Sequence, residues 1–328
     1  MKQDRATAHL TITVSSLTRK RPAMVKALVE SWGAMDVPDN CTVICLIVEN
    51  DTAPETQALI EGMNPLPNGL AQRYVLEPEP GIPFGRNRAA KEAIANGSDL
   101  LVFADDDEVV AKDWLVRLVA GYRAGEAVLL GAPLRTAPPL DGLSKLEQIM
   151  HANIAARYTS KERRAASLAS LNATPRVTVV TNNWMGETRL FSEAGIWFDE
   201  SMRYTGGTDS KLCAEVKDAG YTVGWVKDAY VYETIPRDRL SFGYQFARAR
   251  DQANTHFHRK MQAKPIARYG LILHLPTKTI AALALLIALP LTGGKTLLKL
   301  ARTTGWMVGR IGAAFGTRSK LYTNITGD

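Results

Sequence analysis

The sequence predicts an α/β protein built on a mainly parallel, doubly wound sheet. Through the first half of the 328 residues, apolar strand-like segments alternate with segments of helical apolar spacing, which is typical of parallel sheets covered by helices. Polar clusters follow several of the expected strands, and ligands of open α/β sheets bind at the carboxyl ends of strands. The chain is long enough for one large domain and an appended region.

The first half opens with a strand rich in threonine, isoleucine and valine. A helix is expected after it, because Pro22 suits a first helical position and apolar residues follow at helical spacing. In order, we expect strands at Leu10–Ser16, Thr42–Val48, Arg73–Leu76 and Leu100–Ala104, and helices from Pro22, at Glu55–Met63, around Arg88–Ala95 and from about Asp113 to Tyr122.

The second half is less regular, and its elements are expected at longer and less even intervals. We expect strands at Val128–Ala132 and Val177–Thr181, strand material from Tyr221 to Val231, and helices at Leu143–Ser170 and Ser210–Ala219.

Positive charge is concentrated at the C-terminal end. Of 40 basic and 33 acidic residues, residues 252–328 hold 11 and 1, which leaves residues 1–251 with 29 and 32 and a net charge of −3. We therefore expect an α/β domain at 1–251 and a basic helical tail at 252–328. Three cysteines, an odd and sparse set, argue against a disulfide framework and fit a reducing cytosol.

The tail has features of a membrane-associating region. Tyr269–Leu291 is mostly apolar, but two prolines, a histidine and a lysine interrupt it, so it is a poor candidate for a simple spanning helix. Lys295–Phe315 has the spacing of a basic amphipathic helix, which is typical of binding to an anionic membrane surface. The alternative is a helix pair packed on the body of the protein.

Four consecutive acids, Asp105 to Glu108, directly follow the strand expected at Leu100–Ala104. Like charges side by side repel, so a positive partner is expected to hold them. A divalent cation bridging a diphosphate is such a partner, because Mg²⁺ and Mn²⁺ prefer carboxylate and phosphate oxygens. The alternative is a solvated acidic loop.

Other polar clusters also fall near the ends of expected strands. Ser15–Pro22 combines hydroxyls and bases at a helix start, and Gly81–Arg88 is a glycine-bearing loop with two arginines, both suited to phosphate. Glu49 could accept hydrogen bonds from a ribose or base. Asp209 precedes another expected helix, where it could be an N-cap or a base that deprotonates an acceptor hydroxyl.

In their order, these motifs resemble family 2 glycosyltransferases of the GT-A fold, particularly the bacterial exopolysaccharide group that includes succinoglycan-pathway enzymes. The resemblance covers about residues 10–250 and is not specific for a sugar. It rests on Thr18–Pro22, Val48–Asp51, Gly85–Arg88, Phe103–Glu108, Asn182-Asn183, Gly206–Asp209 and Val231–Glu233.

The resemblance implies a role for each matching residue. Asp105 and Asp107 match the Asp-x-Asp metal motif, with Asp107 the more direct ligand of Mg²⁺ or Mn²⁺, and Asp209 matches the catalytic base. Glu233 stands where many relatives place a metal-binding histidine, and it is expected as a third ligand. Thr208 replaces the usual glutamate. The residues expected to bind the nucleotide sugar are Ser16, Thr18, Arg21, Glu49, Arg86 and Asp106.

The implied activity is inverting transfer of a sugar from a nucleotide-diphosphate sugar, with a UDP-sugar as the expected donor. The acceptor is a hydroxyl of a glycan or lipid-linked glycan in exopolysaccharide synthesis. The enzyme is expected at the cytoplasmic face of the inner membrane, on anionic lipid as a peripheral or monotopic protein, with no nucleic acid as partner.

Two other functions remain open from the sequence. A metal-dependent sugar nucleotidyltransferase also uses acids on an α/β sheet, but it would need a glycine-rich loop where Thr18–Arg21 supplies only bases. A membrane-tethered protein that binds a sugar nucleotide without turnover would explain the loss of glutamate at Thr208.

Overall fold

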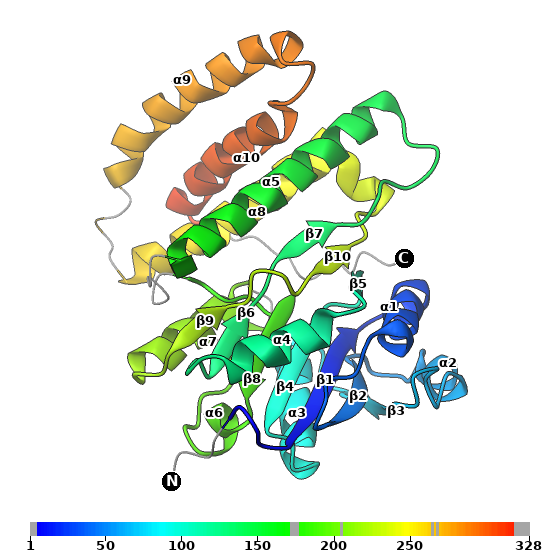
Figure 1. Cartoon of the computed structure of the whole chain (residues 1–328). Helices are drawn as coiled ribbons and strands as arrows, with labels where there is room; N and C mark the ends of the chain where they lie inside the picture. Colours follow the sequence, from blue (N-terminus) through cyan, green and yellow to red (C-terminus); the bar gives the residue numbers. More distant parts are fainter. Residues whose placement is uncertain (1–4, 171–176, 204–205, 264–265, 267–268, 318–328) are drawn as a thin grey trace.

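A computed structural model describes residues 5–170, 177–203, 206–263, 266 and 269–317. A large sheet with helices on both faces forms the body of the protein, and a group of long helices lies beyond a second, small sheet (Figure 1). The predicted α/β architecture is therefore confirmed.

The large sheet has seven strands in the order β3-β2-β1-β4-β8-β6-β9. All neighbouring pairs from β3 to β4 are parallel, and β6 and β9 are parallel to each other. β8 runs antiparallel to both β4 and β6, which makes the sheet mixed at this point. The strand bounds are Leu10–Thr18 (β1), Cys41–Glu49 (β2), Ala71–Leu76 (β3), Leu100–Ala104 (β4), Leu129–Gly131 (β6), Asn183–Glu187 (β8) and Val223–Trp225 (β9).

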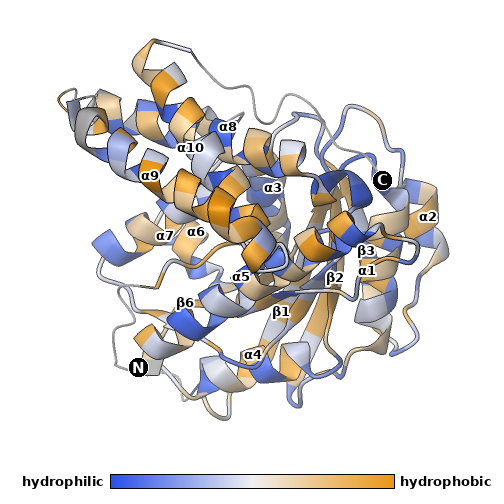
Figure 2. Ribbon diagram, turned by 90° about the horizontal axis from the view of Figure 1, so that it is seen from above, coloured by the Kyte–Doolittle hydropathy of each residue, from blue (hydrophilic) through white to orange (hydrophobic). Residues whose placement is uncertain are grey.

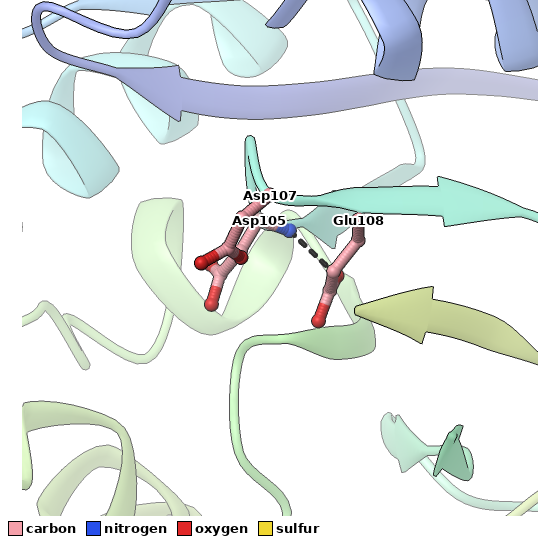
Figure 3. Close-up of side chains that lie close together, drawn as sticks. All are labelled: Asp105, Asp107 and Glu108. Atoms are coloured by element: carbon pink, nitrogen blue, oxygen red, sulfur yellow. Dashed lines mark hydrogen bonds between the residues drawn. The ribbon is translucent and has the colours of Figure 1, made fainter. Parts of the chain in front are cut away.

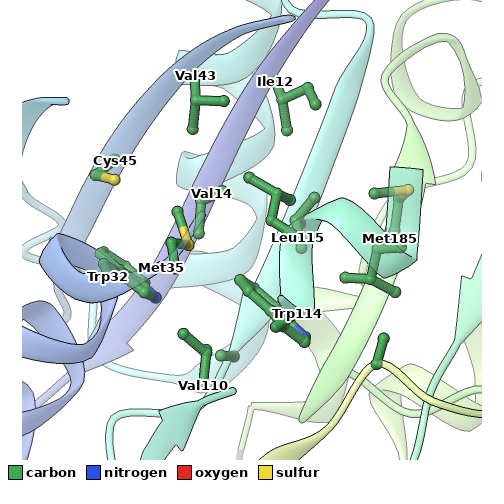
Figure 4. Packing of buried hydrophobic residues seen from close by; sticks show 14 of the residues in the cluster. Ile12, Val14, Trp32, Met35, Val43, Cys45, Val110, Trp114, Leu115 and Met185 are labelled. Carbon is green, nitrogen blue, oxygen red and sulfur yellow. The ribbon is translucent and has the colours of Figure 1, made fainter. Parts of the chain in front are cut away.

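Both faces of the large sheet are buried, because alternate side chains of each strand point to opposite faces. Cys45 and Ile47 of β2 pack with one apolar cluster, whereas Leu46 and Val48 pack with the other. Figure 4 shows the first cluster, in which Trp32 and Trp114 fill the space beside β1. Helices α1 (Pro22–Ala34), α2 (Gln57–Gly62) and α4 (Trp114–Arg123) cover that face, and α3 (Ile82–Ala95), α6 (Arg189–Ser192) and α7 (Thr208–Asp218) cover the other.

The small sheet has the order β5-β10-β7, formed by Glu108–Val110, Val231–Glu233 and Leu134–Thr136. β10 is antiparallel to β5, and in this register Glu233 lies directly opposite Glu108. The small sheet therefore brings two acids from distant parts of the chain together. It lies between the large sheet and the long helices (Figure 1).

The long helices are α5 (Lys145–Ser170), α8 (Phe242–Ala263), α9 (Gly270–Leu291) and α10 (Leu297–Ala314). The face of α10 that carries Gly305 and Gly309 packs on α8, so closely that a Cβ built at Gly309 would lie 2.0 Å from the carbonyl oxygen of Arg250. Val308 and Ile311 of the same helix and Phe315 directly after it remain exposed, so docking of the stretch after Lys295 on a membrane stays a prediction. The alternative, packing on the body, holds for the buried face of α10 alone.

α9 differs from the expectation that its interrupted sequence makes it a poor candidate for a spanning helix. It is one continuous helix with both prolines inside it, and Ile280, Leu283 and Ile287 are each more than half exposed. Figure 2 shows hydrophobic residues along this helix. Among the described residues, one helix, His274–Leu291, is long and apolar enough to cross a membrane by length and composition.

Two further expectations were wrong in detail. Val177–Thr181 is not a strand: Val177 and Val179 are buried, but their backbone joins no sheet. The strand that follows, β8, was missed because Asn183–Glu187 has few β-branched residues. Helix α3 begins at Ile82, so the expected Gly81–Arg88 loop is the first two turns of a helix.

Asn183 itself is part of the buried structure. Its side-chain nitrogen donates to the carbonyl oxygens of Pro133 and Ala229, and its oxygen accepts a hydrogen bond from Trp114 Nε1 at 2.9 Å. The side chain thereby ties β8 to the segments before β7 and β10. The division of the chain at residues 251 and 252 falls inside α8 and stays a prediction.

Candidate active site

The acid run lies at the carboxyl end of β4, beside the carboxyl end of its parallel neighbour β1. Thr18 ends β1, and its hydroxyl donates to Asp106 Oδ2 at 3.0 Å. Arg21 Nη1 donates to Asp106 Oδ1 at 2.9 Å and lies 3.7 Å from Asp107 Oδ2. The structure thus brings together three residues that the sequence assigned to the nucleotide. Asp106 is buried, and its hydrogen bonds from Thr18 and Arg21 hold the turn after β1 in place.

Asp105, Asp107 and Glu108 form the group that could hold a metal ion. One carboxylate oxygen from each lies within 4.8 Å of the other two, and Figure 3 shows the three side chains close together. Glu108 Oε2 accepts a hydrogen bond from the backbone nitrogen of Asp105 at 2.8 Å, which fixes the position of the third carboxylate. Oxygen donors of this kind suit a hard divalent cation.

The carboxyl groups of Asp105, Asp106 and Glu108 hold their protons more tightly than free acids do. Burial raises the pKa of Asp105 to about 6, with Arg86 opposing and the charges of Asp107 and Asp209 adding to the increase. Burial also raises the pKa of Asp106 to about 7, against the effect of Arg21, and it raises the pKa of Glu108 well above its usual value. A divalent cation would relieve this repulsion, so the residues present fit one.

Glu233 lies beside the metal-binding group but has other partners. Tyr158 donates its hydroxyl hydrogen to Glu233 Oε2, and Arg239 Nη1 lies 3.6 Å from Glu233 Oε1. The same Arg239 nitrogen donates to Asp107 Oδ2 at 3.1 Å. Among the described residues, the group with metal-ligand spacing contains Glu108 and not Glu233. The geometry therefore favours Glu108 as third ligand, and the assignment of Glu233 stays a prediction.

Asp209 lies in the first turn of α7, close enough to Asp105 to raise its pKa. The N-cap of this helix is Gly207, whose φ of +95° is a left-handed conformation that favours glycine. Asp209 is therefore not the N-cap, and its Oδ1 accepts from the backbone nitrogen of Ser210 at 2.9 Å. The Asp209 carboxylate therefore does not cap the N-terminus of α7.

Arg86 connects α7 to the acid run. Its Nη1 donates to the hydroxyl of Thr208 at 3.3 Å, and its Nη2 lies 3.8 Å from Asp105 Oδ1. The guanidinium carbon lies 5.6 Å from the centre of the Phe198 ring. Thr208, in the place of a family glutamate, thus serves as an acceptor for the arginine that faces the acids.

Glu49 and Ser16 lie further inside the protein. Glu49 is the neighbour of Thr18 across β1 and β2, but both carboxylate oxygens accept from the backbone nitrogen of Thr56, and Tyr74 donates to one of them at 2.6 Å. Ser16 is buried and its hydroxyl donates to a neighbouring carbonyl. Their assignment to the nucleotide stays a prediction.

No individual role was assigned to two residues of the site from the sequence alone. Glu108 belongs to the acid run, but its sequence position does not reveal that β5 turns its carboxylate back toward Asp105. Arg239 comes from a short 3₁₀ helix, Arg237–Leu240, and no motif marks it. Its contact with Asp107 depends on pairing between β5 and β10, which is a tertiary property.

The fold and the site define a class of protein. A mainly parallel sheet with an Asp-x-Asp group at a strand end is the arrangement of GT-A glycosyltransferases. Over 94% of this chain, the structure is similar to the mannosyltransferase PcManGT from Pyrobaculum calidifontis, with a TM-score of 0.58, 19% identity and 87% of that chain covered. It is also similar to residues 1–349 of S. aureus TarS, with a TM-score of 0.50, 15% identity and 92% of that chain covered.

The sequence comparison identifies the family. The chain is 30% identical over 261 residues to the succinoglycan biosynthesis protein ExoM of Rhizobium meliloti (strain 1021), covering 76% of this chain and 74% of that protein. The protein therefore belongs to the ExoM family of exopolysaccharide glycosyltransferases, and it is a transferase. No protein-family model matches the sequence.

Proposed function

We propose that the protein transfers a sugar from a nucleotide-diphosphate sugar, a UDP-sugar in particular, to a hydroxyl of a lipid-linked glycan during exopolysaccharide synthesis. Membership of the ExoM family supports the pathway, since ExoM is a succinoglycan biosynthesis protein. Two similar structures support the donor class: PcManGT is in complex with GDP-Man and Mn²⁺, and TarS 1-349 is in complex with UDP.

A divalent cation, Mg²⁺ or Mn²⁺, would be held by Asp105, Asp107 and Glu108. Bound there, the cation would neutralise the negative charge that develops on the leaving diphosphate. Arg21 and Arg239 both lie beside Asp107. Their guanidinium groups are suited to binding the diphosphate oxygens of the donor. Asp106 then keeps the turn after β1 in place through Thr18 and Arg21.

Asp209 is the base in this proposal. Its carboxylate accepts the proton of the acceptor hydroxyl while the hydroxyl oxygen attacks the anomeric carbon. The bond between that carbon and the diphosphate oxygen breaks, the nucleoside diphosphate leaves, and the anomeric configuration is inverted. The observation that supports the proposal is that the charge of Asp209, in the first turn of α7, acts on Asp105 at the carboxyl end of β4, although the two residues come from distant parts of the chain.

The acceptor is proposed to be lipid-linked because α9 exposes apolar side chains beside a basic region. Ile280, Leu286 and Leu291 are each more than half exposed, and α10 carries no acidic residue. This arrangement suits the cytoplasmic face of a membrane, where anionic lipid attracts lysine and arginine. Contact with lipid would come from α9 and from the exposed apolar residues Val308 and Ile311 of α10 and Phe315 directly after it.

A screen of nucleotide sugars tests the function. The purified protein is heated with each nucleotide sugar in the presence and absence of Mn²⁺, and the stabilising donor is then incubated with a lipid-linked glycan. We expect metal-dependent stabilisation, release of nucleoside diphosphate, and a product whose anomeric configuration, measured by NMR, is opposite to that of the donor. Stabilisation without any release would indicate a binding protein, and release of inorganic diphosphate from a nucleoside triphosphate would indicate a nucleotidyltransferase.

A further inference from the structure

A cluster of four basic side chains lies where α5, α8 and α10 meet. Arg157 and Lys161 are one turn apart on α5, Arg248 comes from α8, and Arg302 comes from α10. The electrostatic interactions join all four: Arg157 interacts with Arg248, Arg302 interacts with both, and Lys161 interacts with the other three. Three helices thus direct like charges to one place.

The acidic residues of α5, α8 and α10 do not neutralise the positive charge of the cluster. The acidic residues of α5 and α8 are paired elsewhere: Glu162 with Arg135, Glu147 with Arg237, and Asp251 with Arg250. α10 has no acidic residue. Within the part of the chain that the structure describes, the four basic heads form no hydrogen bond or ion pair, and Lys161 only approaches the ring of Tyr158 at 5.9 Å.

Glu233 is the carboxylate that interacts with Arg157 and Lys161. It already accepts a hydrogen bond from Tyr158 and lies beside Arg239, and it can carry one negative charge at most. Four positive charges therefore face a single acid with other partners. Like charges gathered in this way repel one another, and a bound anion would relieve the repulsion.

The pKa values of Lys161 and Arg302 are consistent with a site for an anion. Partial removal from water, followed by repulsion from its three basic neighbours, lowers the pKa of Lys161 to about 8, although the residue as a whole remains exposed. Burial and the charges of Arg157 and Arg248 lower the pKa of Arg302 to about 10. A bound phosphate would raise both, because an opposite charge favours the charged form of each base.

We propose that Arg157, Lys161, Arg248 and Arg302 bind the phosphate groups of the lipid carrier to which the acceptor glycan is attached. This inference rests on the proposed function, because it assigns a site to the acceptor of that reaction. Guanidinium groups from two or more helices can bind a diphosphate through paired hydrogen bonds. The cluster is joined to the acid site through Glu233, which interacts with Asp107.

The position of the cluster favours a lipid carrier as the source of the phosphate. Figure 1 shows α5, α8 and α10 between the small sheet and α9. α10, which supplies Arg302, packs against α9, and Lys278 Nζ of α9 lies 5.5 Å from the ring centre of Trp306 in α10. The cluster therefore has the acid site on one side and the exposed apolar helix on the other. A carrier with an apolar tail on α9 could place its phosphates at the cluster and its glycan toward Asp209.

Vesicle binding by the full-length protein tests the proposal. The probes are phosphatidylcholine vesicles that contain a polyprenyl diphosphate, and vesicles of the same charge that contain phosphatidylglycerol instead. The variants are Lys161→Gln and Arg302→Gln, and the control is Lys299→Gln, which removes the same charge from an exposed position of α10. Hydrogen bonds to charged groups are worth enough that each variant should bind the polyprenyl diphosphate vesicles about tenfold more weakly.

The control should bind polyprenyl diphosphate vesicles as the unchanged protein does, and all three variants should bind phosphatidylglycerol vesicles about equally. Equal losses on both vesicle types, or an equal loss in Lys299→Gln, would overturn the site in favour of diffuse attraction. Binding of UDP with Mn²⁺, measured on the same samples, separates the two proposals. A loss of UDP binding in Arg302→Gln alone would overturn the carrier site by assigning the cluster to the donor diphosphate. Failure of the unchanged protein to bind UDP would refute the proposed function without touching the vesicle result.

Discussion

Replacing Asp106 with asparagine should stabilise the metal-free protein at alkaline pH. The Asp106 carboxyl is buried, and its pKa is raised to about 7 from 3.8. Between about pH 4 and pH 7, the folded protein therefore keeps a proton that the unfolded chain has released, so the free energy of unfolding falls as the pH rises. A shift of roughly three pKa units corresponds to about 4 kcal/mol.

Asparagine has the shape of the protonated acid and keeps an oxygen for the Thr18 hydroxyl, but it cannot take a negative charge. We therefore expect Asp106→Asn to be more stable than the unchanged protein by about 2 kcal/mol at pH 5 and by up to about 4 kcal/mol at pH 8. Some pH dependence should remain, because Glu233 also has a pKa raised to about 7 by burial and by Asp107.

Denaturation by urea at pH 5 and pH 8, in the presence of a chelator, measures the effect. Asp36→Asn is the control, because Asp36 is exposed and its removal should leave the pH dependence unchanged. An Asp106→Asn protein that loses as much stability between the two pH values as the unchanged protein does would show that burial of Asp106 has no such cost. A lower stability at pH 8 would show that the ion pair with Arg21 dominates instead.

Asp107→Asn should abolish metal-dependent nucleotide binding and turnover. Asp106→Asn should retain part of both, because Asp106 lies outside the group with metal-ligand spacing. Equal losses of nucleotide binding in titrations with Mn²⁺ would contradict the Asp-x-Asp assignment. Gly309→Ala should lower the free energy of unfolding by about 1–3 kcal/mol through overpacking against α8, whereas Gly312→Ala, whose Cβ meets only ordinary contacts, should not; equal stabilities in urea would contradict the packing of α10. Binding to anionic vesicles should weaken with salt but not vanish, because the apolar face of α9 adds a part that salt does not screen; complete loss or complete insensitivity in flotation assays would contradict membrane docking through α9.

The parallel half of the fold could be predicted because its apolar residues follow a clear strand or helix periodicity. β4 was expected at Leu100–Ala104 and has those bounds, and the helix expected from Pro22 begins there. β8 could not be predicted, since Asn183–Glu187 is a strand only through its two antiparallel neighbours. Local propensity carries little information about such a strand.

The tail and the site show the same limit. The spacing of apolar residues predicted the α10 helix, but it did not indicate whether its apolar face meets lipid or protein. The close approach of Gly309 to α8 shows that one face meets protein, while Val308, Ile311 and Phe315 stay exposed. Likewise, the acid run was visible in the sequence, whereas the contact of Arg239 with Asp107 and the meeting of Arg157 with Arg302 depend on how distant elements pack.

The most direct test of the function is the comparison of Asp209→Asn with the unchanged protein, in turnover and in donor binding. If Asp209 is the base, release of nucleoside diphosphate in the presence of acceptor should fall by roughly 10²–10⁴-fold, while the affinity for the nucleotide sugar with Mn²⁺ and the urea midpoint stay close to those of the unchanged protein. Asparagine keeps the oxygen that accepts from Ser210, so the start of α7 should be preserved. Turnover near the unchanged rate would contradict the assignment of Asp209 and, with it, the proposed reaction at this site.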